Sequence, residues 1–356
     1  MLKPLNICYL LETAELHGGV RIVFDQARAL AARGHRVVVR AMHGDHRWYP
    51  YPMGVSYVTE LGQPFEGLEP EVVVATFWTT VPPALALGAP LTIHFCQGCE
   101  WEMPEYEDRK KAIEQVYARS IPKITIGPWL NKRLEDRFGT GIFPLESVGQ
   151  IVDTDLYRPR PSKNQAADRD RRQHRPRSVL VVGVFEAWVK GIATALKAVE
   201  LVRAEGFDVQ VVRVSTLPLS TLEQEQFQPE VYHHCLTPVQ MVEVYQQADI
   251  ILAPSRSTEG FGLPFVEALA SGLPAVATAI PSHLSLDPRH DYACFVPEGD
   301  SIAMAAGLRQ LLTDDSCCLA LSQRAVEVVQ NQFQADAVAS RLESCFQHWL
   351  NGQRNE

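Results

Sequence analysis

The sequence alternates short apolar runs with stretches of helical periodicity, and this alternation occurs twice. In the first half, an apolar run at 6–11 (NICYLL) is followed by a Gly-Gly pair and by apolar residues at helical spacing over 20–33. Gly34 is typical of the residue that follows a helix, and 36–42 (RVVVRAM) is the next apolar run. Further runs at 71–75 and 91–95 predict buried strands of a parallel α/β sheet.

The second half begins the same alternation again, after a segment rich in Pro and Arg. The predicted strands are 178–183, 208–214, 249–253 and 274–278, and the predicted helices are 192–204, 238–247, 264–271 and most of 301–350. Two such restarts predict two Rossmann-like domains. In doubly wound sheets ligands bind outside the carboxyl ends of the strands, so the loops after strands are the places to search for a site.

The composition excludes several classes of protein. With 356 residues, 46% hydrophobic and 21% charged, the chain is too apolar for a disordered protein and suits two or three globular domains. A net charge of −9 argues against a nucleic-acid partner, because phosphates require a cationic face. Eight cysteines without regular spacing, no long apolar window and no signal-peptide pattern predict a cytoplasmic protein.

The most informative stretch is 253–278, APSRSTEGFGLPFVEALASGLPAVAT. A strand is predicted to end at its first residue, and Pro264 suits the first turn of a helix. The backbone N–H groups of Gly262 and Leu263 would then be free at a helix N-terminus, which favours an anion. The sequence therefore predicts an anion site at this helix start.

Two glutamates, Glu259 and Glu267, flank the predicted anion site. Their carboxylates accept hydrogen bonds, as the hydroxyls of a ribose or another sugar require. The spacing alone also fits ordinary surface glutamates. Embedded in EGFGLPFVEALASGLPAVAT, however, it resembles the donor-binding segment of retaining GT-B glycosyltransferases of family 4, the glycosyl transferases group 1 type.

The resemblance covers most of residues 5–330. Besides the donor segment, the stretches that carry it are HGGVRIVFDQARALAARGHRVVV, GQIVDTDLYRP, VGVFEAWVKGIATALKAVELV and LTPVQMVEVYQQADIILAPS. It implies the GT-B fold, an α/β architecture with two Rossmann-like domains that face each other across a cleft. The implied parts are an acceptor domain at 1–156, a basic linker at 157–178, a donor domain at 179–334 and a final helix at 335–356 that packs on the first domain.

The resemblance also implies roles for single side chains. Glu267 would hold the nucleotide ribose, Glu259 would lie against the transferred sugar, and Lys190 would neutralise the departing phosphate. The backbone groups implied to contact the diphosphate or the sugar hydroxyls are those of Gly18, Gly19, Phe261, Gly262 and Leu263. The reaction implied by the family needs no metal and no cofactor beyond the nucleotide-diphosphate sugar.

One position departs from the family pattern. The family has an Arg directly after the glycine that ends the first strand of the donor domain, and this chain has Val184 there. Of the two cations that hold the phosphate in the family, this chain therefore has the lysine, Lys190, but lacks the arginine at its usual position. Arg213, Arg256 and Arg21 are the candidates for the missing cation, and the sequence does not choose among them.

His94 is expected to end a strand in LTIHFCQGCEW, at the position of the family's active-site histidine, where it would contact the donor sugar. Taken alone, a histidine in an apolar strand is more often a core residue. With Cys96 and Cys99 it also forms H-x-C-x2-C, but a closed zinc site needs four ligands, and no second C-x2-C follows. We therefore expect no metal site. Gln97, in the same loop, is a weaker candidate on the acceptor side.

The activity implied by the resemblance is transfer of a hexose from a nucleotide-diphosphate sugar to a hydroxyl acceptor, a sugar or a lipid-linked sugar, with retention of configuration. Such a reaction serves bacterial polysaccharide, glycolipid or glycoconjugate synthesis. Two alternatives stay open on sequence alone. One is a GT-B isomerase of the nucleotide-sugar 2-epimerase kind, and the other is a non-catalytic partner subunit whose donor site has degenerated.

The basic segment 157–178 has eight Lys and Arg against two Asp, between halves of net charge −4 and −11. Three interpretations stand: a solvated loop, an attraction to anionic lipid, and an electrostatic collar that draws in an anionic nucleotide sugar. Residues 106–120 (YEDRKKAIEQVYARS) resemble a basic amphipathic helix. The two segments are the candidates for peripheral contact with the inner face of a membrane.

Overall fold

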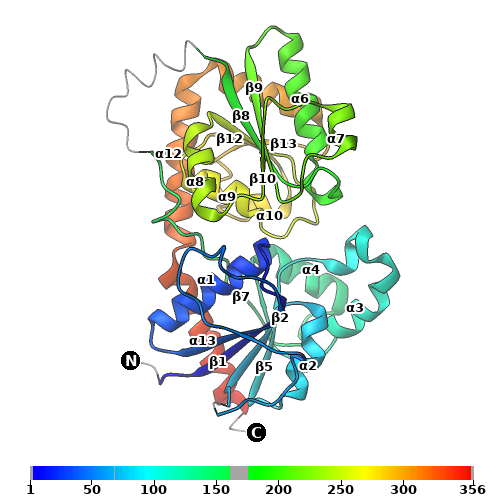
Figure 1. Cartoon of the computed structure of the whole chain (residues 1–356), viewed down its shortest axis with the longest axis vertical. Coiled ribbons are helices and arrows are strands. Elements are labelled where there is room, and N and C mark those ends of the chain that lie inside the picture. Colours follow the sequence, from blue (N-terminus) through cyan, green and yellow to red (C-terminus); the bar gives the residue numbers. More distant parts are fainter. Residues whose placement is uncertain (1–2, 68, 161–174, 354–356) are drawn as a thin grey trace. The chain divides into compact units, whose positions relative to one another are not determined.

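The computed structural model describes residues 3–67, 69–160 and 175–353, and its contacts divide the chain into two units. The first unit comprises Met1–Ile151 and Phe333–Glu356, and the second comprises Val152–Gln332. Helices flank a parallel sheet in each unit (Figure 1). The prediction of two α/β domains is therefore confirmed.

The first unit contains a seven-stranded parallel sheet in the order β3-β2-β1-β4-β5-β6-β7. Its strands are β1 (Asn6–Thr13), β2 (Arg36–His43), β3 (Val55–Tyr57), β4 (Val72–Ala75), β5 (Leu91–Cys96), β6 (Lys123–Thr125) and β7 (Leu145–Ser147). Its helices are α1 (Gly18–Ala32), α2 (Val81–Ala86), α3 (Lys110–Tyr117), α4 (Pro128–Phe138) and α13 (Ala335–Gln353). The order reverses between β1 and β4, which marks the ligand-binding edge of such sheets.

The second unit contains a six-stranded parallel sheet in the order β10-β9-β8-β11-β12-β13. Its strands are β8 (Arg177–Val182), β9 (Val209–Ser215), β10 (Val231–His234), β11 (Ile250–Ala253), β12 (Ala275–Thr278) and β13 (Cys294–Val296). Its helices are α6 (Ile192–Ala204), α7 (Thr221–Gln226), α8 (Pro238–Gln247), α9 (Leu263–Ala270), α10 (Pro281–Leu284), α11 (Ser301–Thr313) and α12 (Asp315–Gln332). Here the order reverses between β8 and β11.

The longer predicted elements match the structure closely. Helices α6 and α8 have the predicted bounds, and the long strands agree within one or two residues. The prediction that His94 ends a strand is wrong, because β5 continues to Cys96. The sequence did not show the three-residue strands β3, β6, β7 and β13, since so short a run carries no clear periodicity.

The division between the units falls at Ile151, earlier than the predicted residue 156. The reason is the burial of Tyr157, whose hydroxyl donates to the carbonyl oxygen of Pro238 at 3.3 Å. Its ring also packs on Tyr245 with 5.8 Å between the ring centroids. These contacts join the start of the basic segment to the second unit, while residues 161–174 of that segment lie outside the described residues.

Helix α13 returns to the first unit and packs against α1. Its buried residues recur at helical spacing, namely Val338, Ala339, Leu342, Phe346, Trp349 and Leu350. A buried glutamate of this helix, Glu343, accepts hydrogen bonds from Arg33 at 2.6 and 2.8 Å and pairs with His35 Nε2 at 2.8 Å. Because Leu5 N–H donates to His35 Nδ1, the Nε2 atom of this ring carries the proton.

Replacing Glu343 with Gln should lower the unfolding free energy by about 1–3 kcal/mol at pH 7, because charged hydrogen bonds to Arg33 and His35 are lost. The hydrogen bonds from Arg33 hold the pKa of Glu343 below its usual value. A lowered carboxyl pKa stabilises the fold above the unfolded-state pKa, near 4.3. The difference between wild type and variant, measured by thermal unfolding, should therefore shrink as the pH falls below about 4. The control Glu105→Gln, on an exposed residue, should change little at either pH.

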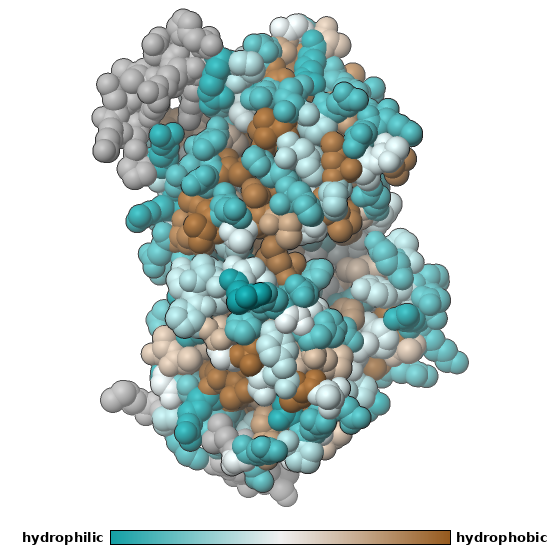
Figure 2. Space-filling model, viewed as in Figure 1, coloured by the Kyte–Doolittle hydropathy of each residue, from teal (hydrophilic) through white to brown (hydrophobic). Residues whose placement is uncertain are grey.

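Among the residues that the structure describes, no helix is both long enough and apolar enough to cross a membrane. In the view of Figure 2, hydrophilic residues cover most of the molecule and apolar residues are scattered between them. The predicted basic amphipathic helix is shorter than expected. Helix α3 spans Lys110–Tyr117 and follows a 3-10 segment at Pro104–Arg109.

Candidate functional site

In the second unit, three loops meet at the carboxyl edge of adjacent strands. They follow β8, β11 and β12, which are neighbours in the sheet, and β8 and β11 border the point where the strand order reverses. The loop after β8 carries Lys190, the loop after β11 carries Glu259, and α10, after β12, carries His283. Parallel strands present their carboxyl ends at one edge, so residues far apart in sequence converge there.

The centre of this site is an ion pair between Lys190 and Glu259. The Lys190 ammonium lies 2.7 Å from Glu259 Oε2, and the Ser255 hydroxyl donates to the same oxygen at 3.1 Å. Glu259 is 8% exposed. Burial, the largest single effect, opposes its ionisation, but Lys190 together with His283 and Ser255 outweighs burial, so the pKa of Glu259 lies below its usual value. The structure therefore brings two of the predicted catalytic residues into direct contact.

The ion pair fills most of the space at this edge. The cavity lined by Lys190, Glu259, Gly262 and Phe265 is only about 20 Å³, roughly the room of one water molecule. A larger anion that binds the Lys190 ammonium would compete with Glu259 for it. An anion suits this exchange, because it offers Lys190 a new partner.

Gly191 allows the Lys190 loop to approach the Glu259 loop. Lys190 ends a 3-10 turn, η4 (Trp188–Lys190), and Gly191 follows with a φ of 59°. A Cβ atom on Gly191 would stand 2.2 Å from the carbonyl oxygen of Pro254. A residue with a Cβ atom therefore does not fit at this close approach, and only glycine does.

Gly191→Ala should therefore destabilise the second unit by two effects, the unfavourable left-handed backbone of an alanine and the clash of its Cβ with Pro254. Gly206 is the matched control, since its φ is +94° and nothing lies within 4 Å of a Cβ there. Gly206→Ala should cost about 1–2 kcal/mol, the penalty for a left-handed residue. The extra loss in Gly191→Ala, measured by denaturant unfolding, reports the clash with Pro254. Equal losses would show that the loops separate freely.

Helix α9 begins at the predicted anion site. Gly262 is its N-cap residue in the left-handed conformation, with a φ of 73°, and no side chain caps its first N–H groups. Leu263 and Pro264 form the first turn, and Phe261 is buried just before it. The open helix start and the Lys190 ammonium are the two groups here that favour an anion.

Glu267 lies one turn into α9 and is buried. The Tyr245 hydroxyl of α8 donates to Glu267 Oε2 at 2.8 Å, which fixes the carboxylate. Sequence reasoning found Glu267 but not this tyrosine, because the two residues are far apart along the chain. The proposed contact of Glu267 with a ribose stays a prediction.

The three arginines named for the missing cation differ in availability. Arg213 is fully buried, donates to Glu223 at 2.6 Å and to the carbonyls of Val181 and Gly183, and so stabilises the end of β8. Arg21 is buried in the first unit, 3.8 Å from Asp25. Arg256 lies in the Glu259 loop, partly exposed, with its guanidinium 4.7 Å from the Trp188 ring centroid. Of the three, Arg256 is the one whose placement suits a ligand of the second unit.

The first unit has a comparable edge, where loops follow the adjacent strands β1, β4 and β5. Gly18 and Gly19 form the start of α1, with no side-chain cap. Gln97, after β5, donates from Nε2 to the carbonyl of Thr76 at 3.2 Å, and its Oε1 would stand 3.1 Å from a Cβ on Gly19. This places Gln97 beside the predicted diphosphate-binding glycines.

His94 lies elsewhere, inside β5 and fully buried. It packs on Tyr117 with 4.7 Å between the ring centroids and pairs with Lys123 of β6 in register. Burial, with a contribution from Lys123, lowers the pKa of His94 to about 3, so the ring is neutral. The catalytic role of His94 stays a prediction, whereas Gln97 holds the position at the strand end that the sequence suggested for His94.

Cys96 and Cys99 are buried free thiols, and burial raises the pKa of both. Protonated thiols of this kind are poor metal ligands and poor nucleophiles. Within the described ranges, no group of three His, Cys, Asp or Glu side chains is arranged to hold a metal ion.

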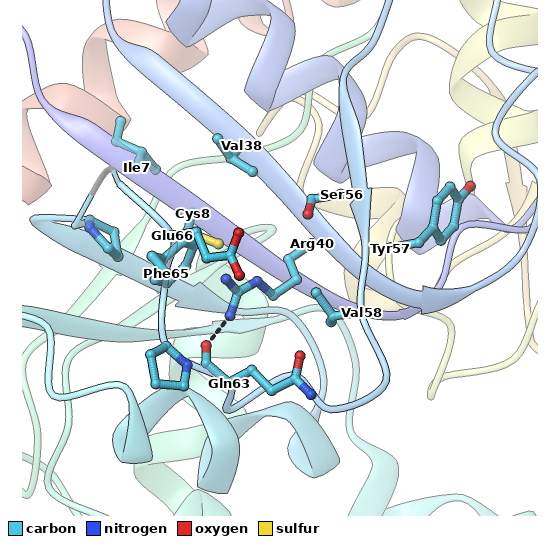
Figure 3. A pocket seen from close by; sticks show the side chains of 12 residues that line it. Ile7, Cys8, Val38, Arg40, Ser56, Tyr57, Val58, Gln63, Phe65 and Glu66 are labelled. Carbon is cyan, nitrogen blue, oxygen red and sulfur yellow. Dashed lines mark hydrogen bonds between the residues drawn. The ribbon is translucent and has the colours of Figure 1, made fainter.

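A larger hollow of about 480 Å³ lies in the first unit, and Arg40 is its charged centre (Figure 3). The Arg40 guanidinium stacks 3.7 Å from the Phe65 ring centroid and donates to the carbonyls of Leu61 and Gln63 at 3.2 and 2.5 Å. These contacts fasten the segment after β3 to β2. None of the predicted site residues lines this hollow. We therefore interpret it as a result of how the segment after β3 packs on the sheet.

Comparison with known proteins fits this geometry. Residues 176–314, which contain Lys190, Glu259 and Glu267, match the family model "Glycosyl transferases group 1". The predicted resemblance to that family is confirmed. A D-inositol 3-phosphate glycosyltransferase of Corynebacterium aurimucosum is 37% identical over 109 residues, which are 31% of this chain and 25% of that relative. A phosphatidyl-myo-inositol mannosyltransferase of Mycolicibacterium smegmatis is 29% identical over 156 residues, 43% of this chain and 40% of that one.

Similarity to solved structures extends over nearly the whole chain. Anabaena Alr3699/HepE, solved in complex with UDP and glucose, superposes with a TM-score of 0.77 at 14% identity, covering 96% of this chain and 99% of that one. At this identity the match shows the fold, and the GT-B fold predicted from the sequence is confirmed. The matches to the first curated relative span only a quarter of its length, so they do not establish the activity of this chain.

Proposed function

We propose that this protein is a retaining glycosyltransferase that moves a hexose from a nucleotide-diphosphate sugar to a hydroxyl acceptor in bacterial glycoconjugate synthesis. The observation that carries the proposal is the Lys190–Glu259 pair at the start of α9, at the switch point of the second sheet. The group 1 match over the same residues and the glycosyltransferase names of the relatives support it.

The arrangement suits transfer from a diphosphate leaving group. The diphosphate would draw Lys190 away from Glu259. The ammonium and the N–H groups of Gly262 and Leu263 would stabilise the charge that develops as the C1–O bond to phosphate breaks. The acceptor hydroxyl forms the new bond to C1 on the same face, and its proton passes to the departing phosphate oxygen. Glu259, released from Lys190, would accept hydrogen bonds from the hydroxyls of the sugar. No metal or further cofactor enters this scheme.

Binding of four nucleoside diphosphates, with the monophosphate CMP beside them, tests the proposal directly. We expect one of UDP, GDP, ADP, CMP and dTDP to raise the melting temperature, since a ligand at 100 times its Kd stabilises a protein by about 2.7 kcal/mol. The responding base then selects the nucleotide sugars for transfer assays, and NMR of the anomeric proton of the product reports retention or inversion. No response to any of the five would contradict the proposal and favour a partner subunit without a donor site.

A further inference from the structure

His283 is a polar residue of the site that the predicted functions leave unused. It lies in α10, directly after β12, and is fully buried. Its Nδ1 atom lies 3.1 Å from the carbonyl oxygen of Thr278, an acceptor, so Nδ1 carries the proton. The Tyr292 hydroxyl donates to the backbone carbonyl of His283 and fixes the other side of the residue.

The Nε2 atom of this ring is therefore a lone-pair acceptor, and it is buried without a hydrogen-bond partner. Burial lowers the pKa of His283 to about 4, so the ring stays neutral at physiological pH. A buried acceptor without a partner destabilises the fold, because it has lost its hydrogen bond to water and gained none in return. A buried acceptor without a partner needs an explanation, and a ligand that donates a hydrogen bond to it would provide one.

The unpartnered atom is directed at the start of α9. A Cβ on Gly262, the N-cap residue, would stand 3.0 Å from His283 Nε2. Phe265, in the first turn of α9, packs on the imidazole with 4.5 Å between the ring centroids. The glycine thus leaves room for Nε2 at the helix start, where Lys190 and Glu259 also converge. Both of these charged residues influence the imidazole electrostatically.

The groups at this helix start define the chemistry of a ligand. The Lys190 ammonium and the N–H groups of Gly262 and Leu263 are donors that suit a phosphate. The Glu259 carboxylate and the His283 imidazole are acceptors, which the fully ionised bridging phosphate of a diphosphate, having no O–H group, cannot satisfy. A ligand that satisfies both sets brings a negative charge and hydroxyl groups together, as a sugar diphosphate does.

We propose that His283 recognises the transferred sugar: its Nε2 atom accepts a hydrogen bond from a sugar hydroxyl beside Glu259. This inference rests on the proposed function and adds to it a residue that discriminates a nucleotide sugar from the nucleoside diphosphate alone. His283 does not take part in bond breaking. It selects for the hydroxyl groups of the donor.

The test compares two ligands on two variants. The probe pair is UDP and UDP-glucose, or GDP and GDP-mannose if the thermal-shift screen selects guanine. His283→Phe keeps an aromatic ring and removes the Nε2 acceptor together with the Nδ1–H that bonds to Thr278, whereas His283→Gln places an amide oxygen near the position of Nε2. His234→Gln, on an exposed residue at the end of β10, is the control.

With His283→Phe, calorimetry should give a Kd for the nucleoside diphosphate within about twofold of wild type and a Kd for the nucleotide sugar raised about tenfold, a difference of 1.4 kcal/mol. His283→Gln should recover part of the loss. Equal changes in both Kd values, or none, would overturn the role of His283 while leaving the proposed function intact. Absence of binding of either probe to the wild type would overturn both.

Discussion

Lys190→Met is expected to lower the rate of sugar transfer by about 100- to 1,000-fold, the usual loss when one group that stabilises transition-state charge is removed. Lys190 pairs with Glu259 at 2.7 Å. It is also the cation that a diphosphate would meet at the start of α9. The measurement is the steady-state rate with the nucleotide sugar identified by thermal shift, together with the Kd of the nucleoside diphosphate.

The same substitution should leave a second signature. Burial favours the neutral form of Glu259, and Lys190 is the main group that opposes this effect. Without the lysine, the pKa of Glu259 should rise. As the pH is lowered, any residual activity that needs the ionised carboxylate should therefore be lost at a higher pH than in wild type. Lys190→Arg keeps the charge and should retain more activity than Lys190→Met.

Lys197→Met is the matched control for this experiment. Lys197 is an exposed lysine of α6 that pairs with Glu200 at 3.1 Å. Exposed pairs of this kind contribute at most about 1 kcal/mol, so transfer should be unchanged. Full activity in Lys190→Met would contradict the proposed mechanism, because it would show that the ammonium does not stabilise the charge on the leaving phosphate.

The donor segment could be predicted from the sequence because its signals are local. Gly262, Pro264 and the glutamates on either side lie within one strand-loop-helix unit, so the open helix start follows from a short stretch of chain. The two-domain α/β fold could be predicted for a similar reason, since each strand and helix carries its own periodicity. Even the bounds of α6 and α8 follow from their apolar spacing.

Contacts between distant segments could not be predicted in this way. His283 reaches Gly262 because β11 and β12 are adjacent in the sheet, and no spacing in the sequence encodes that adjacency. His94 was misplaced for a different reason. The stretch LTIHFCQGCEW was expected to end its strand at His94, but Phe95 and Cys96 continue the apolar run, and the sheet extends β5 over both.

Arg213 shows how burial decides between two roles that sequence left open. A phosphate-binding arginine needs a guanidinium that a ligand reaches, yet this one is fully buried and engaged by Glu223 and by the carbonyls of Val181 and Gly183. Arg213→Met should therefore lower the unfolding free energy by about 3–5 kcal/mol, because it leaves a buried carboxylate without its partner. Denaturant unfolding followed by far-UV circular dichroism measures the loss.

A double variant separates support of the fold from binding of the ligand. Arg213→Met combined with Glu223→Leu replaces the buried pair with apolar side chains, and such replacements are often neutral or stabilising. We expect the double variant to recover most of the stability and to bind the nucleoside diphosphate as wild type does, since neither group faces the ligand. A double variant that unfolds like wild type but binds no nucleotide would instead make Arg213 the missing cation. Because stability and binding then move independently, the result decides whether Arg213 replaces the arginine absent at Val184 or only supports the fold.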